Sequence, residues 1–234
     1  MRLMLCPEFL ALFPEALVGV AAVRGIDNRG EDAALTARLK AAAGAIPERV
    51  GAAPLSEHPR VAVWRDAYRR FGAKPKEHPS SIENLLRRAA KGHAPPHINR
   101  LVDLYNAVSL EALLPAGAED LGAIDGDVEL AVAGSAEPPV RLLGEPEARP
   151  PKEGEVIYRD RHGAICRRWN WKEADRTKIT EATRDAIVVV EGLPPIARAD
   201  VEAALGGIAA AVRDRFGGTA ATAVLDAGRP SLEL

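Results

Sequence analysis

Helical and strand-like patterns occupy different parts of this chain, and that separation limits its possible folds more than any other feature. Apolar side chains recur at helical spacing in four early segments, residues 31–46, 58–72, 79–92 and 97–110. Strand-like runs follow at residues 127–133, 140–144, 155–159, 164–169 and 186–191. A doubly wound fold would instead alternate strands with helices along its whole length. We therefore expect an α+β fold in which helices pack on a mixed or antiparallel sheet.

Local signals place the ends of several elements. Ser80 and Glu83 form a capping-box pattern in the segment 79–92, and Gly92 ends that helix. The turn at 160–163 would close a hairpin between two strands. We also expect a strand at 16–24, a helix at 198–218 and a last strand near 220–225. No glycine-rich dinucleotide motif or P-loop follows a strand, so the sequence gives no sign of those nucleotide sites.

The charge is unevenly distributed along the chain. The whole chain carries −2, whereas residues 60–100 contain ten Lys and Arg against three acids, a local excess of +7. The overall charge gives no general attraction to nucleic acid or to an anionic membrane. A basic segment in a near-neutral protein can nevertheless form an anion-binding face. The alternative is a set of ordinary solvated helix faces, and the sequence leaves both open.

Cysteine content and the N-terminal residues bear on the environment of the chain. Cys6 and Cys166 are its only cysteines and form no CxxC motif, which fits a reducing cytosol and argues against a disulfide scaffold. The apolar residues 1–20 are interrupted by Pro7, Glu8 and Pro14 and have no clear cleavage site. We interpret them as folded structure rather than a signal peptide, and we expect no membrane-spanning segment.

The segment 97–110 carries a polar stripe beside its apolar face. Asn99, Asp103 and Asn106 lie at i, i+4 and i+7, so a helix would align them. Their side chains are short and cannot extend to solvent as Lys or Arg can. Buried polar groups need partners, and a ligand in a pocket would supply them. Local capping and side-chain to backbone bonds are the alternative.

Residues 167–180, RRWNWKEADRTKIT, hold two of the three tryptophans. If the preceding strand continues, its residues alternate, with Asn170 on one side and Trp169 and Trp171 on the other. Thr177 and Thr180 add hydroxyl groups that suit a polar ligand. An ordinary Thr-rich loop that caps itself would have the same composition.

Conventional catalytic and metal-binding patterns are scarce. Only His93 and His97, among five histidines, are four residues apart, and the prolines between them exclude a helix. We therefore expect no metal site. No GxSxG nucleophile motif appears. The acidic residues at 119–120, 125 and 127 are expected to be solvated acids in turns.

Three separate segments carry a resemblance to a known family. In chain order they are KPKEHPSSIENLLRRAAKG, INRLVDLYNAVSLEALLPAGAEDLGAIDGDVEL and CRRWNWKEADRTKITEATRDAIVVVEGLPP. Together they resemble the freestanding B3/B4-domain proteins, which are similar to the editing module of the phenylalanyl-tRNA synthetase β subunit. That module's Asn-x-x-Val-Asp-x-x-Asn helix is matched by Asn99, Val102, Asp103 and Asn106. Its Thr-bearing segment before a strand is matched by residues 180–183.

The resemblance covers about residues 60–215. It implies a single B3/B4-like domain over 1–234, in which residues 1–57 are a family-specific N-terminal part. The chain departs from the synthetase module at RRWNWKEAD, where that module carries a Gly-rich turn. Because this stretch would shape the part of the pocket that selects the amino acid, a preference for tyrosine is not carried over.

The implied activity is hydrolysis of the ester that joins a wrong amino acid to tRNA, by a positioned water and without metal or cofactor. An aminoacyl ester is already activated, so positioning the water and excluding the correct amino acid can suffice. The tryptophans of 167–180 would pack beneath the pocket or stack on tRNA. Side chains suited to bind the ammonium, carbonyl and ribose hydroxyl groups are Asn99, Asp103, Asn106, Asn170, Thr177 and Thr180.

The resemblance thus implies a cytoplasmic protein whose partner is tRNA, with no DNA and no membrane. A non-catalytic module that binds tRNA or a free amino acid would share every motif and remains open, as does an enzyme acting on a small ester or amide. Phosphate contacts are expected from the basic side chains Arg65, Arg69, Arg70, Lys74, Arg87, Arg88 and Lys91.

Overall fold

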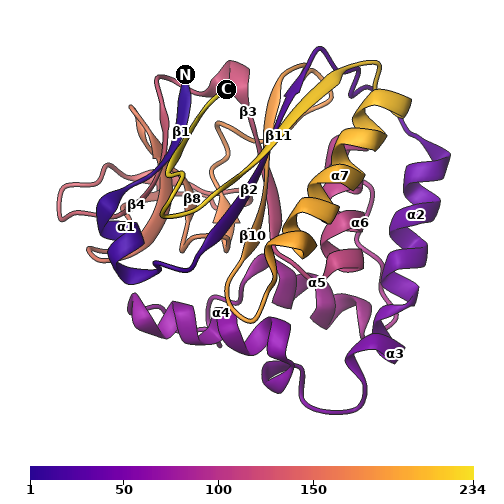
Figure 1. Cartoon of the computed structure of the whole chain (residues 1–234), viewed down its shortest axis with the longest axis horizontal. Helices are drawn as coiled ribbons and strands as arrows, with labels where there is room; N and C mark the ends of the chain where they lie inside the picture. The colour runs from indigo at the N-terminus through magenta and orange to yellow at the C-terminus, as the bar shows by residue number, and fades with distance from the viewer.

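A computed structural model describes residues 1–234 and has an α+β fold, as the separated patterns predict (Figure 1). The helices are α1 (Pro7–Leu12), α2 (Ala33–Gly44), α3 (Ile46–Val50), α4 (Pro59–Arg70), α5 (Ser81–Ala89), α6 (Arg100–Ala112) and α7 (Arg198–Arg215). The strands are β1 (Arg2–Leu5), β2 (Leu17–Arg24), β3 (Ala116–Asp120), β4 (Val128–Val132), β5 (Val140–Arg141), β6 (Ala148–Arg149), β7 (Val156–Asp160), β8 (Gly163–Arg167), β9 (Lys172–Glu173), β10 (Ala186–Gly192), β11 (Thr219–Leu225) and β12 (Ser231–Glu233).

Two sheets form the centre of the molecule. The six-stranded sheet has the order β12-β1-β4-β7-β8-β9, and only its β1–β4 pair is parallel. The four-stranded sheet is antiparallel throughout, in the order β11-β2-β10-β3. β5 and β6 form a separate two-stranded ribbon. The expectation of mixed and antiparallel pairing is confirmed, with two main sheets in place of one.

The four-stranded sheet lies between the six-stranded sheet and a layer of helices (Figure 1). α6 and α7 pack against it, and α2 packs on α6. Strand β10 contributes side chains to the hydrophobic cores on both faces of its sheet, because alternate residues of a strand point to opposite faces. Val188 and Val190 belong to the helix-side core, whereas Ile187 belongs to the core between the sheets.

Helices α4 and α5 lie below the two sheets in Figure 1. The inner face of α4 buries Val61, Trp64 and Tyr68. Trp64 meets Trp169 edge-on, with ring centroids 5.0 Å apart. This contact links α4 to the segment that follows β8.

Most predicted elements are confirmed within a few residues, including α2, α4, α5, β2, β10 and the hairpin that joins β7 to β8. Helix α6 begins later than predicted, because Asn99 is its N-cap and accepts a hydrogen bond from the Val102 N–H at 3.1 Å. Ser80 caps α5 in the same way, accepting from the Glu83 N–H at 3.3 Å. The Glu83 carboxylate turns to arginines of α4 and α5, so the capping box is only half formed.

The strands predicted at 140–144 and 164–169 are too long. β5 has only two residues, and β8 ends at Arg167 because Arg168 and Trp169 have positive φ angles of 49° and 64°. The sequence pattern does not predict β1, β3 or β12. β3 reads AGAED, which lacks the β-branched and aromatic residues that mark a strand. Its pairing with β10 therefore comes from tertiary contact rather than local preference.

Residues 1–57, expected to be a family-specific part, contribute to the centre of the fold. β1 lies between β12 and β4, and β2 lies between β11 and β10. Leu3 and Phe9 are fully buried. Residues 1–20 are therefore folded structure, as predicted. None of the helices combines the length and apolar character needed to cross a membrane.

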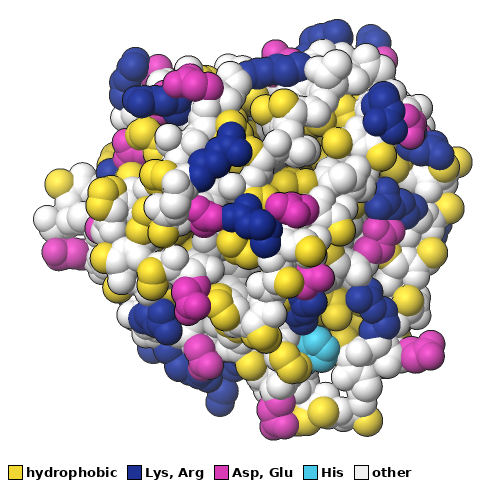
Figure 2. All heavy atoms as spheres, in the orientation of Figure 1, with side chains coloured by type: hydrophobic (Ala, Val, Ile, Leu, Met, Phe, Trp, Pro, Cys, Tyr) yellow, Lys and Arg dark blue, Asp and Glu magenta, His cyan; other side chains and the backbone are white.

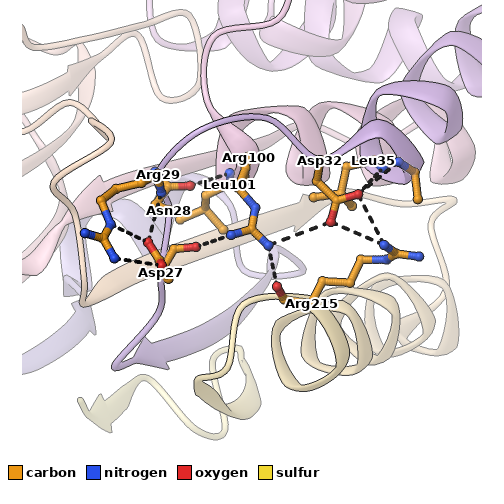
Figure 3. Close-up of polar contacts among 9 residues, drawn as sticks. Asp27, Asn28, Arg29, Asp32, Leu35, Arg100, Leu101 and Arg215 are labelled. Carbon is orange, nitrogen blue, oxygen red and sulfur yellow. Dashed lines mark hydrogen bonds and ion pairs between the residues drawn. The ribbon is translucent and has the colours of Figure 1, made fainter.

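The loop at residues 25–32 ties together elements that are distant in the sequence (Figure 3). Asn28 is 1% exposed, and its Oδ1 accepts a hydrogen bond from the Leu101 N–H at 2.8 Å. Its Nδ2 donates to Asn99 Oδ1 at 3.1 Å. Arg100 donates to the main-chain carbonyl of Arg215, where α7 ends. The start of α6 is thus fixed by hydrogen bonds within the protein.

We predict that Asn99→Ala lowers the free energy of unfolding by about 1–3 kcal/mol, because α6 loses its cap and the buried Asn28 amide loses a partner. Urea unfolding monitored by circular dichroism measures the change. The matched control is Asn106→Ala, at a half-buried position on the same helix, which should cost less than about 0.5 kcal/mol. Equal losses from the two variants would contradict the capping role of Asn99.

Candidate functional site

A pocket of about 310 Å³ lies between the two sheets, and we call it the inter-sheet pocket. Strands β3 and β10 line it from the four-stranded sheet, and β1, β4, β7, β8 and β9 line it from the six-stranded sheet. The rest of its wall comes from residues 169–171, from Ser81 at the start of α5 and from Leu143. Its surface is mostly hydrophobic, with side chains such as Ile165, Ile187 and Val189.

Glu191 lines this pocket and accepts three side-chain hydrogen bonds. Tyr158 Oη and Trp169 Nε1 each donate to Glu191 Oε1 at 2.6 Å. Asn170 Nδ2 donates to Glu191 Oε2 at 2.7 Å. Asn170 Oδ1 in turn accepts from Tyr68 Oη at 2.9 Å, so its amide group is held from both ends.

Three carboxyl groups in the pocket have raised pKa values. Burial raises the pKa of Glu191 to about 7, although its three hydrogen bonds act in the opposite direction. Burial also raises the pKa of Glu173 to about 7. Burial and the nearby Glu173 raise the pKa of Glu119 well above its ordinary value. Lys172, the only Lys or Arg in the lining, bonds to Glu145. The pocket therefore offers acid groups without a matching cation.

Glu119 is the least satisfied of these acids. It is 8% exposed, and its Oε2 has no hydrogen-bond partner. The fully buried Thr177 hydroxyl lies close enough to lower the pKa of Glu119, yet it also completes no hydrogen bond. The expectation that Glu119 is a solvated acid in a turn is wrong, because β3 places it in the pocket lining beside Gly117. No three His, Cys, Asp or Glu side chains are placed to hold a metal ion.

Residues 168–171, which we call the Trp turn, do not continue β8 as predicted. The positive φ angles of Arg168 and Trp169 reverse the chain instead. Trp169 is fully buried, and its ring lies 4.9 Å from Phe9 and 4.8 Å from Phe13, centroid to centroid. It packs beneath the pocket and cannot stack on RNA. Trp171 is half-buried and forms part of the pocket wall.

The six predicted site residues do not come together in one place. Asn170 lines the inter-sheet pocket, and Thr177 is buried beside Glu119. Thr180 is exposed in a turn, where its Oγ1 accepts a hydrogen bond from the Ala182 N–H at 3.3 Å. This hydroxyl therefore caps its own loop, as the alternative interpretation of the Thr-rich segment has it.

The polar stripe of α6 lies outside the pocket lining. The Asn99 side chain bonds within the protein, also donating to the Ile179 carbonyl at 3.2 Å. Asp103 is 1% exposed, and its Oδ2 lies 2.7 Å from His97 Nδ1. Asn106 is half-buried on the same helix. Capping and local bonding thus account for the first two residues without a ligand.

Arg65 requires a correction among the predicted phosphate-binding residues. Its side chain is 9% exposed and donates to Glu83 Oε1 at 2.7 Å. Arg87 donates to the same oxygen at 2.6 Å. Because the Arg65 guanidinium is directed to the buried Glu83 carboxylate, it does not face a phosphate on the surface.

The other predicted phosphate-binding residues are exposed, but most have partners. Arg69 pairs with Asp66, and Lys74 pairs with Glu77 at 3.1 Å. On the face shown in Figure 2, basic and acidic side chains are interspersed rather than gathered into one basic patch. The exposed members of the set are Arg69, Arg70, Lys74, Arg87, Arg88 and Lys91.

Sequence reasoning missed three polar groups of the pocket, namely Tyr158, Glu173 and Glu191. Glu191 did carry a signal, because it follows Ile187 and Val189 at a spacing of two in an otherwise apolar strand. An acid on the inward face of such a strand must be buried. Glu173 lies in a two-residue strand, and no local pattern marks it.

Comparisons with known proteins find a matching domain family. The sequence model of the B3/4 domain family matches residues 63–217. Among solved structures, the chain is similar to an N-terminal fragment of the phenylalanyl-tRNA synthetase beta-subunit from Pyrococcus horikoshii, with 12% identity and a TM-score of 0.48. The alignment covers 93% of this chain and 49% of that one, so this chain spans about half of that fragment's length. A search of curated proteins found no match.

The pKa of Glu191 makes stability depend on pH. Because the pKa is raised in the folded state, folding favours the protonated form, and this favourable contribution is lost as the pH rises from about 4.5 to about 7. We predict that Glu191→Gln removes up to about 3 kcal/mol of the fall in unfolding free energy between pH 5 and pH 8.

Urea unfolding at a series of pH values measures this difference. The control is Glu153→Gln at an exposed position, which should follow the wild-type curve. Parallel pH dependence in Glu191→Gln and the wild type would show that Glu191 does not titrate in this range.

Proposed function

Because the chain belongs to the B3/4 domain family, we propose that it hydrolyses the ester bond of mischarged aminoacyl-tRNA. One observation carries the proposal. The three segments that resemble a synthetase editing module each contribute to the inter-sheet pocket, through Ser81, Glu119 and Asn170 among others. Segments that are far apart in the sequence thus meet at one pocket.

The chemistry of the pocket suits an amino acid bound as an ester. Its apolar walls can hold a side chain, and a volume of about 310 Å³ is at the lower end of the range for small-ligand sites. An α-ammonium group would supply the cation that the buried acids lack. The unpaired Oε2 of Glu119 is the acceptor that we assign to this ammonium. Its charge would in turn favour the ionised form of the acids.

The proposed reaction needs a water and a base. Glu173 has a pKa of about 7, near the optimum for a general base at neutral pH, and the Ala118 backbone N–H beside it acts to lower this pKa. It would take a proton from a water whose oxygen attacks the ester carbonyl. The ribose oxygen then leaves and receives a proton, which releases the free amino acid. Glu191 would act through Asn170, whose amide it holds in place.

A non-catalytic module that binds tRNA or an amino acid is the second candidate. The observation that favours it is the lack of an activated nucleophile in the pocket, because burial raises the pKa of the Cys166 thiol well above its ordinary value. Such a module would bind the same ligands without turnover. Release of the amino acid from tRNA therefore separates the two functions.

We predict that the wild type releases labelled amino acid from at least one mischarged tRNA in a broad panel, and does so in excess chelator. Glu173→Gln should reduce this rate by about a hundredfold or more, because the base is lost. Glu48→Gln, at an exposed position of α3, should retain the wild-type rate. Lack of release by the wild type on every tRNA would leave the binding module, and inhibition by chelator would refute the metal-free reaction.

The tRNA would be held weakly by the exposed basic residues of α4 and α5, since acidic side chains lie among them. We predict that replacing Arg87, Arg88 and Lys91 together by Ala lowers tRNA affinity. The plot of log K against log salt should become shallower by about 2, if three phosphate contacts at roughly 0.7–0.9 each are lost.

A salt titration of tRNA binding tests this surface. The charge-matched control replaces the exposed Lys40, Arg213 and Arg229 by Ala, and it should keep the wild-type slope. If both triple variants lose the same affinity and slope, the contact is not specific to α5.

A further inference from the structure

Arg168 carries a buried guanidinium group that no protein acceptor satisfies. Its side chain is 9% exposed, and its nearest acidic oxygen is Glu155 Oε2 at 3.7 Å, beyond hydrogen-bond distance. Both Glu155 oxygens are already engaged by Arg167, at 2.8 Å each. Burial lowers the pKa of Arg168, as expected for a cation that lacks compensation. The guanidinium nitrogens form no hydrogen bond within the protein but are not sealed from solvent, so their five N–H donors remain available to water or to a ligand.

Arg168 lines a hollow of about 130 Å³, and we call it the Arg168 hollow. Lys74, from the loop after α4, and the exposed Lys152 also line it. His78 contributes a buried Nδ1 that has no hydrogen-bond partner.

Three acids line the same hollow. Glu155 is satisfied by Arg167, and Glu77 is paired with Lys74 at 3.1 Å. The third, Glu153, is exposed to solvent. The unpaired cationic donors of the hollow therefore belong to Arg168 and Lys152, and His78 Nδ1 can also donate when it carries the proton of the ring.

Trp171 connects the hollow to the inter-sheet pocket. The Arg168 guanidinium lies 4.4 Å from the centroid of its ring, and the His78 ring lies 4.6 Å away. Trp171 also lines the inter-sheet pocket. Trp171 therefore contacts two residues of the Arg168 hollow and also forms part of the inter-sheet pocket.

We propose that the Arg168 hollow is an anion subsite that binds a phosphate group, with Arg168 as its main donor. A guanidinium fork matches two oxygens of a phosphate, and such charge-assisted bonds are stronger than neutral ones. This assignment rests on the proposed function for its natural ligand, the phosphate on the 5′ side of the nucleoside that carries the amino acid. A free phosphate ion would use the same chemistry.

The test compares two stable substrate analogues by isothermal titration calorimetry. Both are 3′-amide analogues of an aminoacyl-adenosine, one with and one without a 5′-phosphate. In the wild type, the 5′-phosphate should raise affinity by about tenfold to a hundredfold. Arg168→Gln should lose this gain, while Arg213→Gln, at an exposed position on α7, should keep it. Equal affinities of the two analogues for the wild type would overturn the assignment of the subsite to the phosphate of an RNA, and a lack of binding of inorganic phosphate as well would overturn the subsite itself.

A second variant keeps the test decisive if Arg168→Gln does not fold. Lys152→Gln changes an exposed lining residue and should reduce the phosphate gain severalfold. With Arg168→Gln unfolded, an undiminished gain in Lys152→Gln would overturn the proposal.

Titration with inorganic phosphate distinguishes a free phosphate ion from the phosphate of an RNA as the ligand. It also tests the anion subsite independently of the proposed hydrolysis. Binding of phosphate alone to the wild type, lost in Arg168→Gln, supports the anion subsite even if no tRNA is hydrolysed. Binding of phosphate without any gain for the phosphorylated analogue would overturn the assignment to RNA. Hydrolysis of mischarged tRNA by an Arg168→Gln variant with an unchanged phosphate gain would overturn the subsite and leave the proposed function standing.

Discussion

The buried carboxylate of Glu191 joins the parts of the molecule that meet at the pocket. It belongs to β10 of the four-stranded sheet, and it accepts hydrogen bonds from Tyr158 of the six-stranded sheet and from the Trp turn. Through Asn170 the same network reaches Tyr68 of α4. One acid thus fixes the spacing of two sheets and a helix, and apolar contacts alone, being non-directional, would not specify that arrangement.

A buried acid of this kind has two consequences for the site. Glu191 accepts hydrogen bonds from three donors, and losing them would leave a buried acceptor unsatisfied at a cost in free energy. The Trp turn, which supplies two of these donors, is therefore held in one conformation. Glu119 and Glu173 have no comparable set of donors, and this leaves them able to respond to a ligand. The pocket therefore combines a rigid acid that positions its neighbours with two acids whose charge depends on what is bound.

The sequence predicted what depends on local spacing and missed what depends on distant contacts. Periodicity placed α4, α5 and β10, and the two tryptophans of residues 167–180 brought attention to Asn170. The polar stripe of α6 was interpreted as a pocket wall, whereas the helix begins three residues later than predicted and Asn99 precedes it as its cap. Arg65 looked like a surface cation, since only the fold reveals Glu83 opposite it. Glu173 could not be assigned, because its burial is created by the facing sheet.

The Trp turn explains why the strand predicted at 164–169 is wrong at the residues that border the proposed site. A regular strand would send Trp169 and Trp171 to one face. Positive φ angles at two successive non-glycine residues are uncommon and costly, and strain of this kind persists only where surrounding contacts impose it. Here those contacts are the aromatic core around Trp169 and the Glu191 carboxylate. The reversal places Trp169 in the core, Asn170 on the pocket and Arg168 on the hollow behind Trp171. Four consecutive residues thereby serve three environments, which a continuous strand with two faces could not supply.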